Sequence, residues 1–132
     1  KEVLRLHGPA PMVIRRSKFD EELNGFSFPA GTTFVPSIAA VHRDPHVFDQ
    51  ADSFLPQRWL EQDEAKLKSM QDHWMPFMVG ARGCIGQMFA LTELRVVLAT
   101  LIRRFHIDLV SRPKQLVRML VLPSNIHLKV RP

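Results

Sequence analysis

The 132-residue chain has only one cysteine, six scattered histidines and no uninterrupted apolar run long enough to cross a bilayer. One cysteine cannot form an internal disulfide, which is compatible with a reducing compartment or a cytosol-facing position. Histidines spread along the chain do not predict a zinc site. The net charge of +5 comes from lysines and arginines with no dense basic run interleaved with aromatic residues, so we expect no nucleic-acid partner.

The composition is typical of a folded protein. Apolar residues make up 45% of the chain and charged residues 23%, a balance that argues against intrinsic disorder. A chain of this length can bury one moderate core, and one domain is the expectation. The chain begins at Lys1, without a methionine, and its first residues already form a helical pattern. We therefore expect it to be the C-terminal piece of a longer protein.

The stretch Phe77–Gly86 surrounds the single cysteine, Cys84, with small residues and one cation. Glycines crowded around a reactive side chain indicate that the backbone passes close to something large, and here they would let the loop lie against a planar ligand. Arg82 adds a permanent positive charge suited to a carboxylate. The glycines of this stretch are Gly80, Gly83 and Gly86.

An apolar pattern with helical spacing starts directly after the cysteine, near Ile85, and continues to Arg104. It predicts the longest helix of the chain, and we expect several of its apolar side chains to lie in a core. The N-terminus of this helix would direct unpaired N–H groups and the positive end of its dipole at Cys84, which favours the thiolate form. An accessible thiolate beside a flat surface is a metal ligand or a nucleophile.

The pattern Phe77-x-x-Gly80-x-Arg82-x-Cys84-x-Gly86 resembles the haem-binding signature of the cytochrome P450 family. Five fixed positions at fixed spacing make the resemblance specific. Met78 departs from it, since the family more often has a small or polar residue there. The resemblance implies that Cys84 is the axial thiolate ligand of the iron in haem b. The other implied haem contacts are Phe77, Gly80, Arg82, Gly86, Ala90 and, toward a propionate, Arg15.

The resemblance extends to the start of the chain. Glu2-Val3-Leu4-Arg5 is similar to the family's Glu-x-x-Arg helix, and the three-residue spacing places Glu2 and Arg5 on one helix face. Phe54–Trp59 is similar to the segment that supplies the family's second arginine, here Arg58. The implied role of these three residues is structural, because two guanidinium groups around a partly buried carboxylate fix one arrangement more than they add net stability.

The expected fold class is mixed α and β, as the C-terminal part of a single P450 domain. Small antiparallel sheets, a meander and a terminal β-hairpin are expected beside the helices. The expected segments are the Glu-x-x-Arg helix over 1–8, a β-rich segment over 10–40, the meander over 41–76, the haem-ligand loop over 77–86, the long helix over 85–104 and β-strands over 106–132.

Turn signals set the expected strands of the β-rich segment. Asn24-Gly25 is the strongest short hairpin signal, because a type I′ turn needs two residues with positive φ. Met12–Phe19 and Thr32–Ala40 are expected to be extended, giving a small antiparallel sheet. His42 lies in a segment that resembles the family's His-Arg-Asp-Pro motif, and we expect it to fix its loop through hydrogen bonds rather than to bind a metal. A short, charged, exposed helix is expected over Glu61–Gln71.

The C-terminal region is expected to be β-structured. His106–Val110 predicts a strand, and 117–122 with 126–130 predicts a hairpin around Pro123-Ser124-Asn125, whose residues supply turn chemistry. In the family, the tip of this hairpin points toward the substrate. The residues that the resemblance assigns to a possible substrate pocket are Ala10, Val13, Met119 and Leu120.

The resemblance implies the function of the longer parent protein. That function is a haem-thiolate monooxygenase, which inserts one oxygen atom from dioxygen into an apolar organic substrate with electrons from an NADPH-dependent flavoprotein reductase. Pro56-Gln57-Arg58-Trp59 looks like the eukaryotic microsomal type, which implies the cytosolic face of the endoplasmic reticulum membrane and an anchor upstream of Lys1. The fragment alone is expected to be inactive, because the family's oxygen-activating central helix would lie upstream.

Three alternatives are open. One is a haem-thiolate isomerase, dehydratase or reductase that shares the ligand loop without using dioxygen and an external reductase. The second is a non-catalytic truncated fragment. The third, a hydrolase that pairs Cys84 with His73 or His106, is the weakest, since the sequence offers no third residue to orient the histidine.

Overall fold

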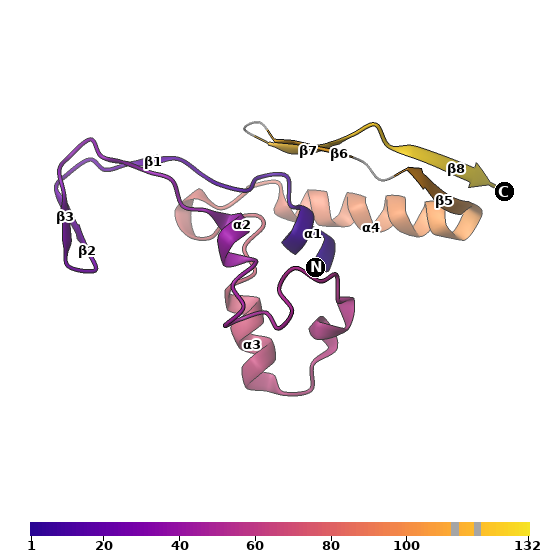
Figure 1. The fold of residues 1–132 in the computed structure, drawn as a ribbon, viewed down its shortest axis with the longest axis horizontal. Coiled ribbons are helices and arrows are strands. Elements are labelled where there is room, and N and C mark those ends of the chain that lie inside the picture. The colour runs from indigo at the N-terminus through magenta and orange to yellow at the C-terminus, as the bar shows by residue number, and fades with distance from the viewer. Residues whose placement is uncertain (112–113, 118–119) are drawn as a thin grey trace. The chain divides into compact units, whose positions relative to one another are not determined.

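The computed structural model describes residues 1–111, 114–117 and 120–132, and the chain divides into two compact units, Lys1–Pro76 and Phe77–Pro132. Both units contain helices and antiparallel strands (Figure 1), which confirms the predicted mixed α and β fold class. Among the described residues, no helix has both the length and the apolar character that crossing a membrane would require.

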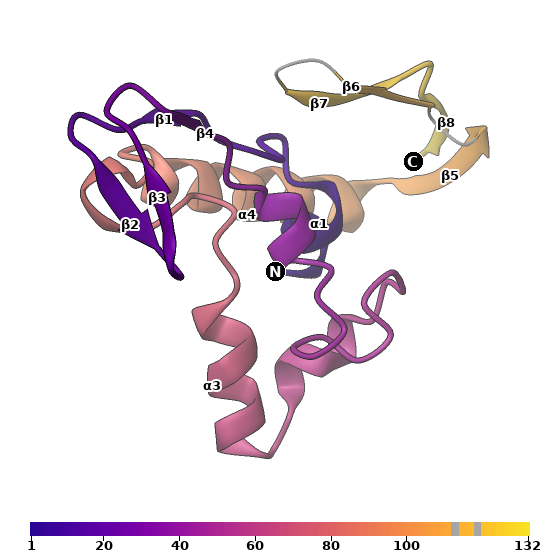
Figure 2. The same ribbon diagram turned by 60° about the vertical axis from the view of Figure 1, so that its left-hand side comes forward.

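The unit Lys1–Pro76 combines short helices with two two-stranded antiparallel sheets. In these sheets β1 pairs with β4, and β2 pairs with β3 as a hairpin beyond them (Figure 2). The elements of this unit are α1 (Glu2–His7), β1 (Arg15–Arg16), β2 (Glu21–Leu23), β3 (Phe26–Phe28), β4 (Thr33–Phe34), α2 (Ile38–Val41), the 3₁₀ helix η1 (Pro56–Leu60) and α3 (Glu64–Asp72).

The predicted hairpin turn is confirmed. Asn24 and Gly25 have φ angles of 51° and 80°, and they connect a register in which Leu23 lies opposite Phe26. Two consecutive residues with positive φ are the requirement of a type I′ turn, whose twist matches that of the flanking strands.

The extended run predicted over Thr32–Ala40 is wrong in its second half. Only Thr33–Phe34 is a strand there, and α2 begins at Ile38. The reason is local, because the Ser37 hydroxyl accepts a hydrogen bond from the Ala40 N–H at 3.2 Å and so caps the helix. The other extended run, predicted over Met12–Phe19, contains the two-residue strand β1, which pairs with β4, and an isolated antiparallel bridge between Met12 and Ser37.

The core of this unit forms where α3 packs against residues that precede it in the meander. Phe48 and Met70 are buried to 0% and 1% exposure, with Ala51 beside them. The Asp63 carboxylate accepts hydrogen bonds from the backbone N–H groups of Ala65 and Lys66 and fixes the start of α3. The short charged helix predicted here is therefore present, but one of its apolar side chains is a core residue.

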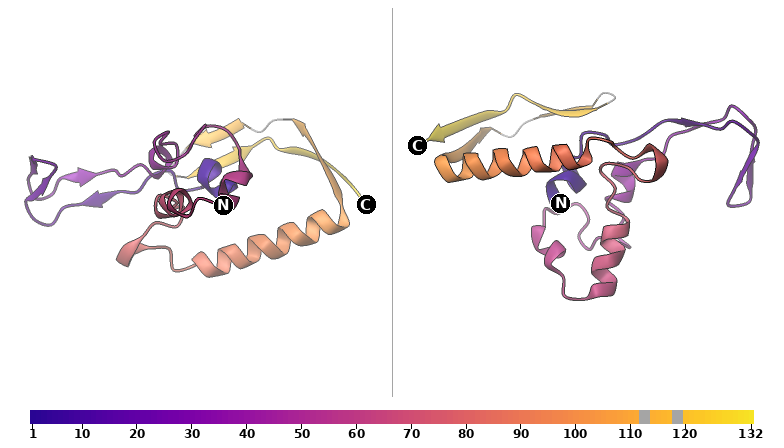
Figure 3. Two further views of the ribbon diagram at one scale, coloured as in Figure 1. Left: turned by 90° about the horizontal axis from the view of Figure 1, so that it is seen from below. Right: turned by 180° about the vertical axis from the view of Figure 1, so that it is seen from behind.

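The unit Phe77–Pro132 is built on one long helix followed by strands. Figure 3 shows α4 continuing almost directly into β5. In the two sheets β5 pairs with β8 and β6 pairs with β7, both antiparallel. The elements are the 3₁₀ helix η2 (Gly80–Arg82), α4 (Gln87–Arg104), β5 (His106–Ser111), β6 (Lys114–Val117), β7 (Val121–Ser124) and β8 (His127–Arg131).

The predicted strand His106–Val110 is confirmed as β5, whereas the predicted hairpin around Pro123-Ser124-Asn125 is wrong. Pro123 lies within β7, opposite Gln115 of β6, and β8 pairs with β5 rather than with β7. Asn125 has a φ of 55° and does turn the chain between β7 and β8. Turn residues predict where the chain bends, but not which strand it joins afterwards.

The long helix is confirmed over Gln87–Arg104, but none of its residues is buried. Met88, Phe89 and Ile102 each expose about three quarters of their surface. The expectation that several of its side chains lie in a core is therefore not met within this chain. Helical spacing shows which residues share a face, whereas burial needs a second element packed against that face.

We predict that Gly25→Ala loosens the β2–β3 hairpin. An added Cβ would meet no atom within 4 Å, but the positive φ of Gly25 disfavours any residue with a Cβ. Amide hydrogen exchange of a peptide covering β2 and β3 in the full-length protein should accelerate about tenfold. Ser27→Thr, on exposed β3, is the control and should leave exchange unchanged. Equal exchange in both variants would contradict the assignment of the turn.

Candidate functional site

Hydrogen bonds within the backbone close the cysteine loop. The Cys84 N–H donates to the Phe77 carbonyl at 2.8 Å, and the Gly83 N–H donates to the Gly80 carbonyl at 2.9 Å. Helix α4 begins directly after the loop, with Gly86 as its N-cap. The loop therefore holds Cys84 at the start of α4 without help from a hydrophobic core.

The backbone of the loop bends through the left-handed region twice, at Met78 with φ 60° and at Gly80 with φ 72°. Glycine adopts this conformation freely, whereas a side chain such as that of Met78 makes it unfavourable by about 1–2 kcal/mol. Met78 is the residue at which the sequence departs from the family signature. The departure therefore falls on a residue whose conformation favours glycine.

Cys84 is exposed, and glycines leave space around it. A Cβ added at Gly86 would lie 3.9 Å from the Cys84 sulfur, and one added at Gly83 would lie 3.2 Å from the Gly80 carbonyl oxygen. In the part of the chain that the structure describes, no group of three histidine, cysteine or acidic residues could hold a metal ion. A single accessible sulfur fits a metal that arrives with its other ligands, as iron does in haem.

The other predicted haem-binding residues are placed as follows. Phe77 is half-buried at the start of the loop, and Ala90 is half-buried in the first turn of α4, where its N–H donates to the Gly86 carbonyl at 2.9 Å. Arg82 is exposed, and within the described residues its guanidinium makes no hydrogen bond or ion pair. Arg15 lies on β1 of the other unit, where it donates to the Ile14 carbonyl at 2.9 Å.

The possible pocket residues are not brought together by a described contact. Ala10 and Val13 are half-buried and lie in the segment that connects α1 to β1. Leu120 is exposed, and Met119 lies outside the described residues. Their role stays a prediction.

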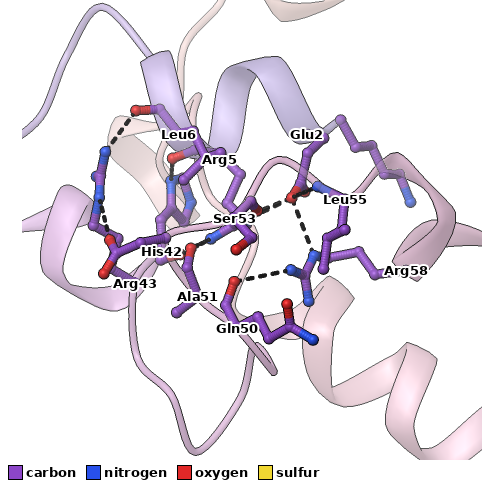
Figure 4. A network of polar contacts seen from close by, with 12 residues as sticks. Glu2, Arg5, Leu6, His42, Arg43, Gln50, Ala51, Ser53, Leu55 and Arg58 are labelled. Atoms are coloured by element: carbon purple, nitrogen blue, oxygen red, sulfur yellow. Dashed lines mark hydrogen bonds and ion pairs between the residues drawn. The ribbon is translucent and has the colours of Figure 1, made fainter.

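The Glu-x-x-Arg helix is confirmed as α1, and Glu2 lies at the centre of a buried polar network (Figure 4). Glu2 is 3% exposed and Arg5 1%. One oxygen of Glu2, Oε1, accepts hydrogen bonds from Arg5 Nη2 at 2.8 Å and Arg58 Nε at 3.1 Å. The predicted trio of Glu2, Arg5 and Arg58 is thus in direct contact.

Two further donors to Glu2 come from the meander and were not predicted. The Leu55 N–H donates to Oε1 at 3.1 Å, and the Trp59 indole N–H donates to Oε2 at 2.8 Å, beside Arg5 Nε at 3.0 Å. The helical geometry of η1 brings Arg58 and Trp59 to the same carboxylate. A tryptophan one residue after the arginine was the available signal, because a buried indole needs an acceptor.

Arg5 uses all five of its N–H donors, three of them on the backbone of the meander. Its Nη1 donates to the carbonyls of His42 and Ala51, each at 2.6 Å, and its Nη2 donates to that of Ser53 at 3.1 Å. The remaining two N–H groups bind Glu2. Carbonyls far apart in sequence are thereby fixed by one planar guanidinium.

His42 is buried and fixes its loop, as predicted. Its Nδ1 lies 3.1 Å from the Arg5 carbonyl, and its Nε2 accepts a hydrogen bond from the Met75 N–H at 3.0 Å. His46 follows His42 at a spacing of four residues, which can place two histidines on one metal. Both ring nitrogens of His42 are already used in hydrogen bonds, so none is left to bind a metal. Cys84 makes no side-chain hydrogen bond to a histidine among the described residues; His106 pairs with Asp108 and His73 with the Ser69 carbonyl. His106 and His73 thus each use a ring nitrogen for a partner other than Cys84.

Hydrogen bonds determine the charge of Glu2. Burial raises the pKa of its carboxyl, but donation from Arg5, the Leu55 backbone, Trp59 and Arg58 outweighs burial and lowers the pKa from 4.5 to about 2. The carboxylate of Glu2 therefore binds a proton at a higher pH in the unfolded chain than in the folded chain. The resulting stabilisation is present above pH 4.5 and is lost as the pH falls through 2.

We predict that this carboxylate contributes about 3 kcal/mol to the pH dependence of stability. Denaturant unfolding of the full-length protein at pH 7 and pH 3 should show a smaller acid-induced loss of stability in Glu2→Gln than in the unmodified protein. The glutamine cannot titrate, so it removes this contribution while leaving other acidic groups in place. Identical acid-induced losses in both proteins would contradict the prediction.

Comparison with known proteins gives the same assignment as the two motifs. The family model described as cytochrome P450 matches residues 1–130. The chain is 36% identical over 135 residues to cytochrome P450 4d2 of Drosophila melanogaster, covering 100% of this chain and 26% of that protein. It is 35% identical over 131 residues to the mitochondrial sterol 26-hydroxylase of Rattus norvegicus, covering 95% of this chain and 25% of that protein.

Comparison with solved structures supports the same family assignment. The retinoic acid-bound cyanobacterial CYP120A1 matches with a TM-score of 0.86 at 28% identity, over 98% of this chain and 30% of that one. The chain thus spans about a quarter of the length of the curated relatives it matches. With the family model matching nearly every residue, and with the cysteine loop and the Glu2 network both present, this chain belongs to the cytochrome P450 family.

Proposed function

We propose that the full-length parent of this chain is a haem-thiolate monooxygenase, and that Cys84 is the axial ligand of its haem b iron. The observation that carries the proposal is the exposed sulfur of Cys84, held by backbone hydrogen bonds in a glycine-lined loop at the start of α4. Bound haem would supply the activation of dioxygen, with one oxygen atom entering an apolar organic substrate and the other leaving as water after two electrons and two protons are added.

The residues of this chain would bind and orient the haem. Arg82 presents an exposed guanidinium without a partner among the described residues, which suits a propionate. Arg15 is proposed for the other propionate. The remaining proposed contacts to the porphyrin are Phe77, Gly80, Gly86 and Ala90.

The Glu2 network would serve the site indirectly. Arg5 binds backbone carbonyls of the meander, Glu2 forms an ion pair with Arg5, and Arg58 completes the ion-pair set. We propose that this fixed arrangement is needed for haem incorporation, and that the units Lys1–Pro76 and Phe77–Pro132 are parts of one P450 domain.

The substrate pocket, redox partner and location are proposed from the resemblance to the family. Ala10, Val13, Met119 and Leu120 are the proposed pocket residues, and small and apolar side chains suit an apolar substrate. The proposed electron donor is an NADPH-dependent flavoprotein reductase, and the proposed location is the cytosolic face of the endoplasmic reticulum membrane. Since one relative is named as mitochondrial, fractionation of cells that express the full-length protein distinguishes the two membranes.

We predict that Cys84→Ser abolishes the thiolate-type Soret band in the carbon monoxide difference spectrum of the reduced full-length protein. The serine hydroxyl does not replace a thiolate as an electron-rich iron ligand. Ile85→Val is the matched control in the same loop and should retain the band. A thiolate-type band in Cys84→Ser would contradict the assignment of the ligand.

We predict that Glu2→Ala loses haem incorporation. Without the carboxylate, Arg5 and Arg58 lose their shared counter-ion, and breaking a buried ion pair in this way is unfavourable by about 3–5 kcal/mol. The measurement is the haem-to-protein ratio of the purified full-length protein. Glu22→Ala, which removes an exposed carboxylate from β2, should leave that ratio unchanged. A normal holoprotein yield from Glu2→Ala would refute the structural role.

A further inference from the structure

His42 joins two segments, one 37 residues before it at Arg5 and the other 33 residues after it at Met75. On one side its Nδ1 faces the carbonyl of Arg5 at 3.1 Å, and on the other its Nε2 accepts from the N–H of Met75 at 3.0 Å. The imidazole is 2% exposed. Arg5 returns a contact, because its Nη1 donates to the His42 carbonyl at 2.6 Å. His42 and Arg5 therefore hold each other through two separate hydrogen bonds.

The hydrogen bond between Met75 and His42 lies at the C-terminal end of the unit Lys1–Pro76. Pro76 has no N–H, so Met75 supplies the last backbone donor before Phe77. Phe77 is the residue whose carbonyl accepts the hydrogen bond from the Cys84 N–H. The hydrogen bond from Met75 to His42 is thus two residues away from the first hydrogen bond of the cysteine loop.

These two contacts require one form of the imidazole. A carbonyl oxygen can only accept, so Nδ1 must carry a hydrogen; an amide N–H can only donate, so Nε2 must be without one. The ring is therefore neutral and in the Nδ1–H tautomer. Protonation at Nε2 would place two donors opposite each other and break the bond to Met75.

We propose that His42 is a positioning residue for the haem-ligand loop, and that its neutral Nδ1–H tautomer fixes the point at which the chain enters that loop. The inference rests on the proposed role of Cys84 and adds to it the residue that connects the Glu2 and Arg5 network to the segment before the loop. The hydrogen bond to the Arg5 carbonyl orients the ring, and the hydrogen bond from the Met75 N–H positions the segment before the loop.

The surroundings of His42 oppose its protonation. Burial lowers the pKa of His42 below the ordinary 6.5; the hydrogen bond to the Arg5 carbonyl opposes this, and the positive charges of Arg5 and Arg43 lower the pKa further. Glu2 neutralises Arg5, and Asp52 pairs with Arg43 at 3.4 Å. The segment Trp74–Pro76 contributes no charged side chain.

Two substitutions separate the two hydrogen bonds of the ring. The amide of His42→Asn lies at the position of Nδ1, so it can still donate to the Arg5 carbonyl but cannot reach Met75. The amide oxygen of His42→Gln lies at the position of Nε2, so it can accept from the Met75 N–H. His46→Asn, at an exposed histidine of the same segment, is the matched control.

The measurement is the ratio of thiolate-type to non-thiolate-type Soret bands in the reduced carbon monoxide complex of the full-length holoprotein. Loss of one hydrogen bond should lower this ratio about fivefold in His42→Asn. His42→Gln and His46→Asn should stay close to the unmodified protein. Equal ratios in His42→Asn and His42→Gln, whether both normal or both reduced, would overturn the proposal.

Acidification of the unmodified protein tests the same inference without a variant. As the pH falls below 6.5, the protection of the Met75 amide from hydrogen exchange should decrease before global unfolding. Protection that stays constant until the whole protein unfolds would overturn the proposal. This readout does not depend on the iron ligand, so failure of the Cys84 assignment and failure of the His42 inference are distinguishable.

Discussion

A carboxylate that is almost completely withdrawn from water organises the first half of this chain. Glu2 is surrounded by five hydrogen bonds from Arg5, Arg58, Trp59 and the Leu55 backbone. Removing a charge from water is unfavourable unless such donors compensate, so the carboxylate tolerates only conformations in which all of them are in place. A meander with little regular secondary structure thereby acquires one defined conformation.

The cysteine loop is organised on a different physical basis. No residue of 77–111 or 120–132 is buried, so the loop depends on backbone hydrogen bonds and on backbone angles that glycine tolerates. Cys84 is held at the end of a helix with its sulfur exposed, and the helix that follows displays apolar side chains along its length. The unit Lys1–Pro76 thus contains a buried hydrogen-bond network, and the unit Phe77–Pro132 contains an exposed sulfur.

Short-range chemistry was predictable from the sequence, and long-range pairing was not. Asn24-Gly25 predicted its turn because the requirement for positive φ lies within two residues, and the spacing of Glu2 and Arg5 predicted their contact because both lie on one helix face. The cysteine loop could be recognised for the same reason. Each of these features is contained in a short segment.

The features that were missed depend on partners distant in sequence. The strand after Asn125 pairs with β5 rather than with its neighbour β7, and no local residue specifies that choice. Trp59 reaches Glu2 across 57 residues, and His42 reaches Met75 across 33. The helix at Ile38 is an exception, since Ser37 was a local capping signal within a run of residues that otherwise favours a strand.

The proposed bond between the Cys84 sulfur and iron can be measured by X-ray absorption at the iron edge of the full-length holoprotein. We expect one sulfur scatterer in the first coordination shell of the unmodified protein, and its replacement by a lighter atom in Cys84→Ser. A first shell of nitrogen and oxygen alone in the unmodified protein, or a sulfur that persists in Cys84→Ser, would contradict it.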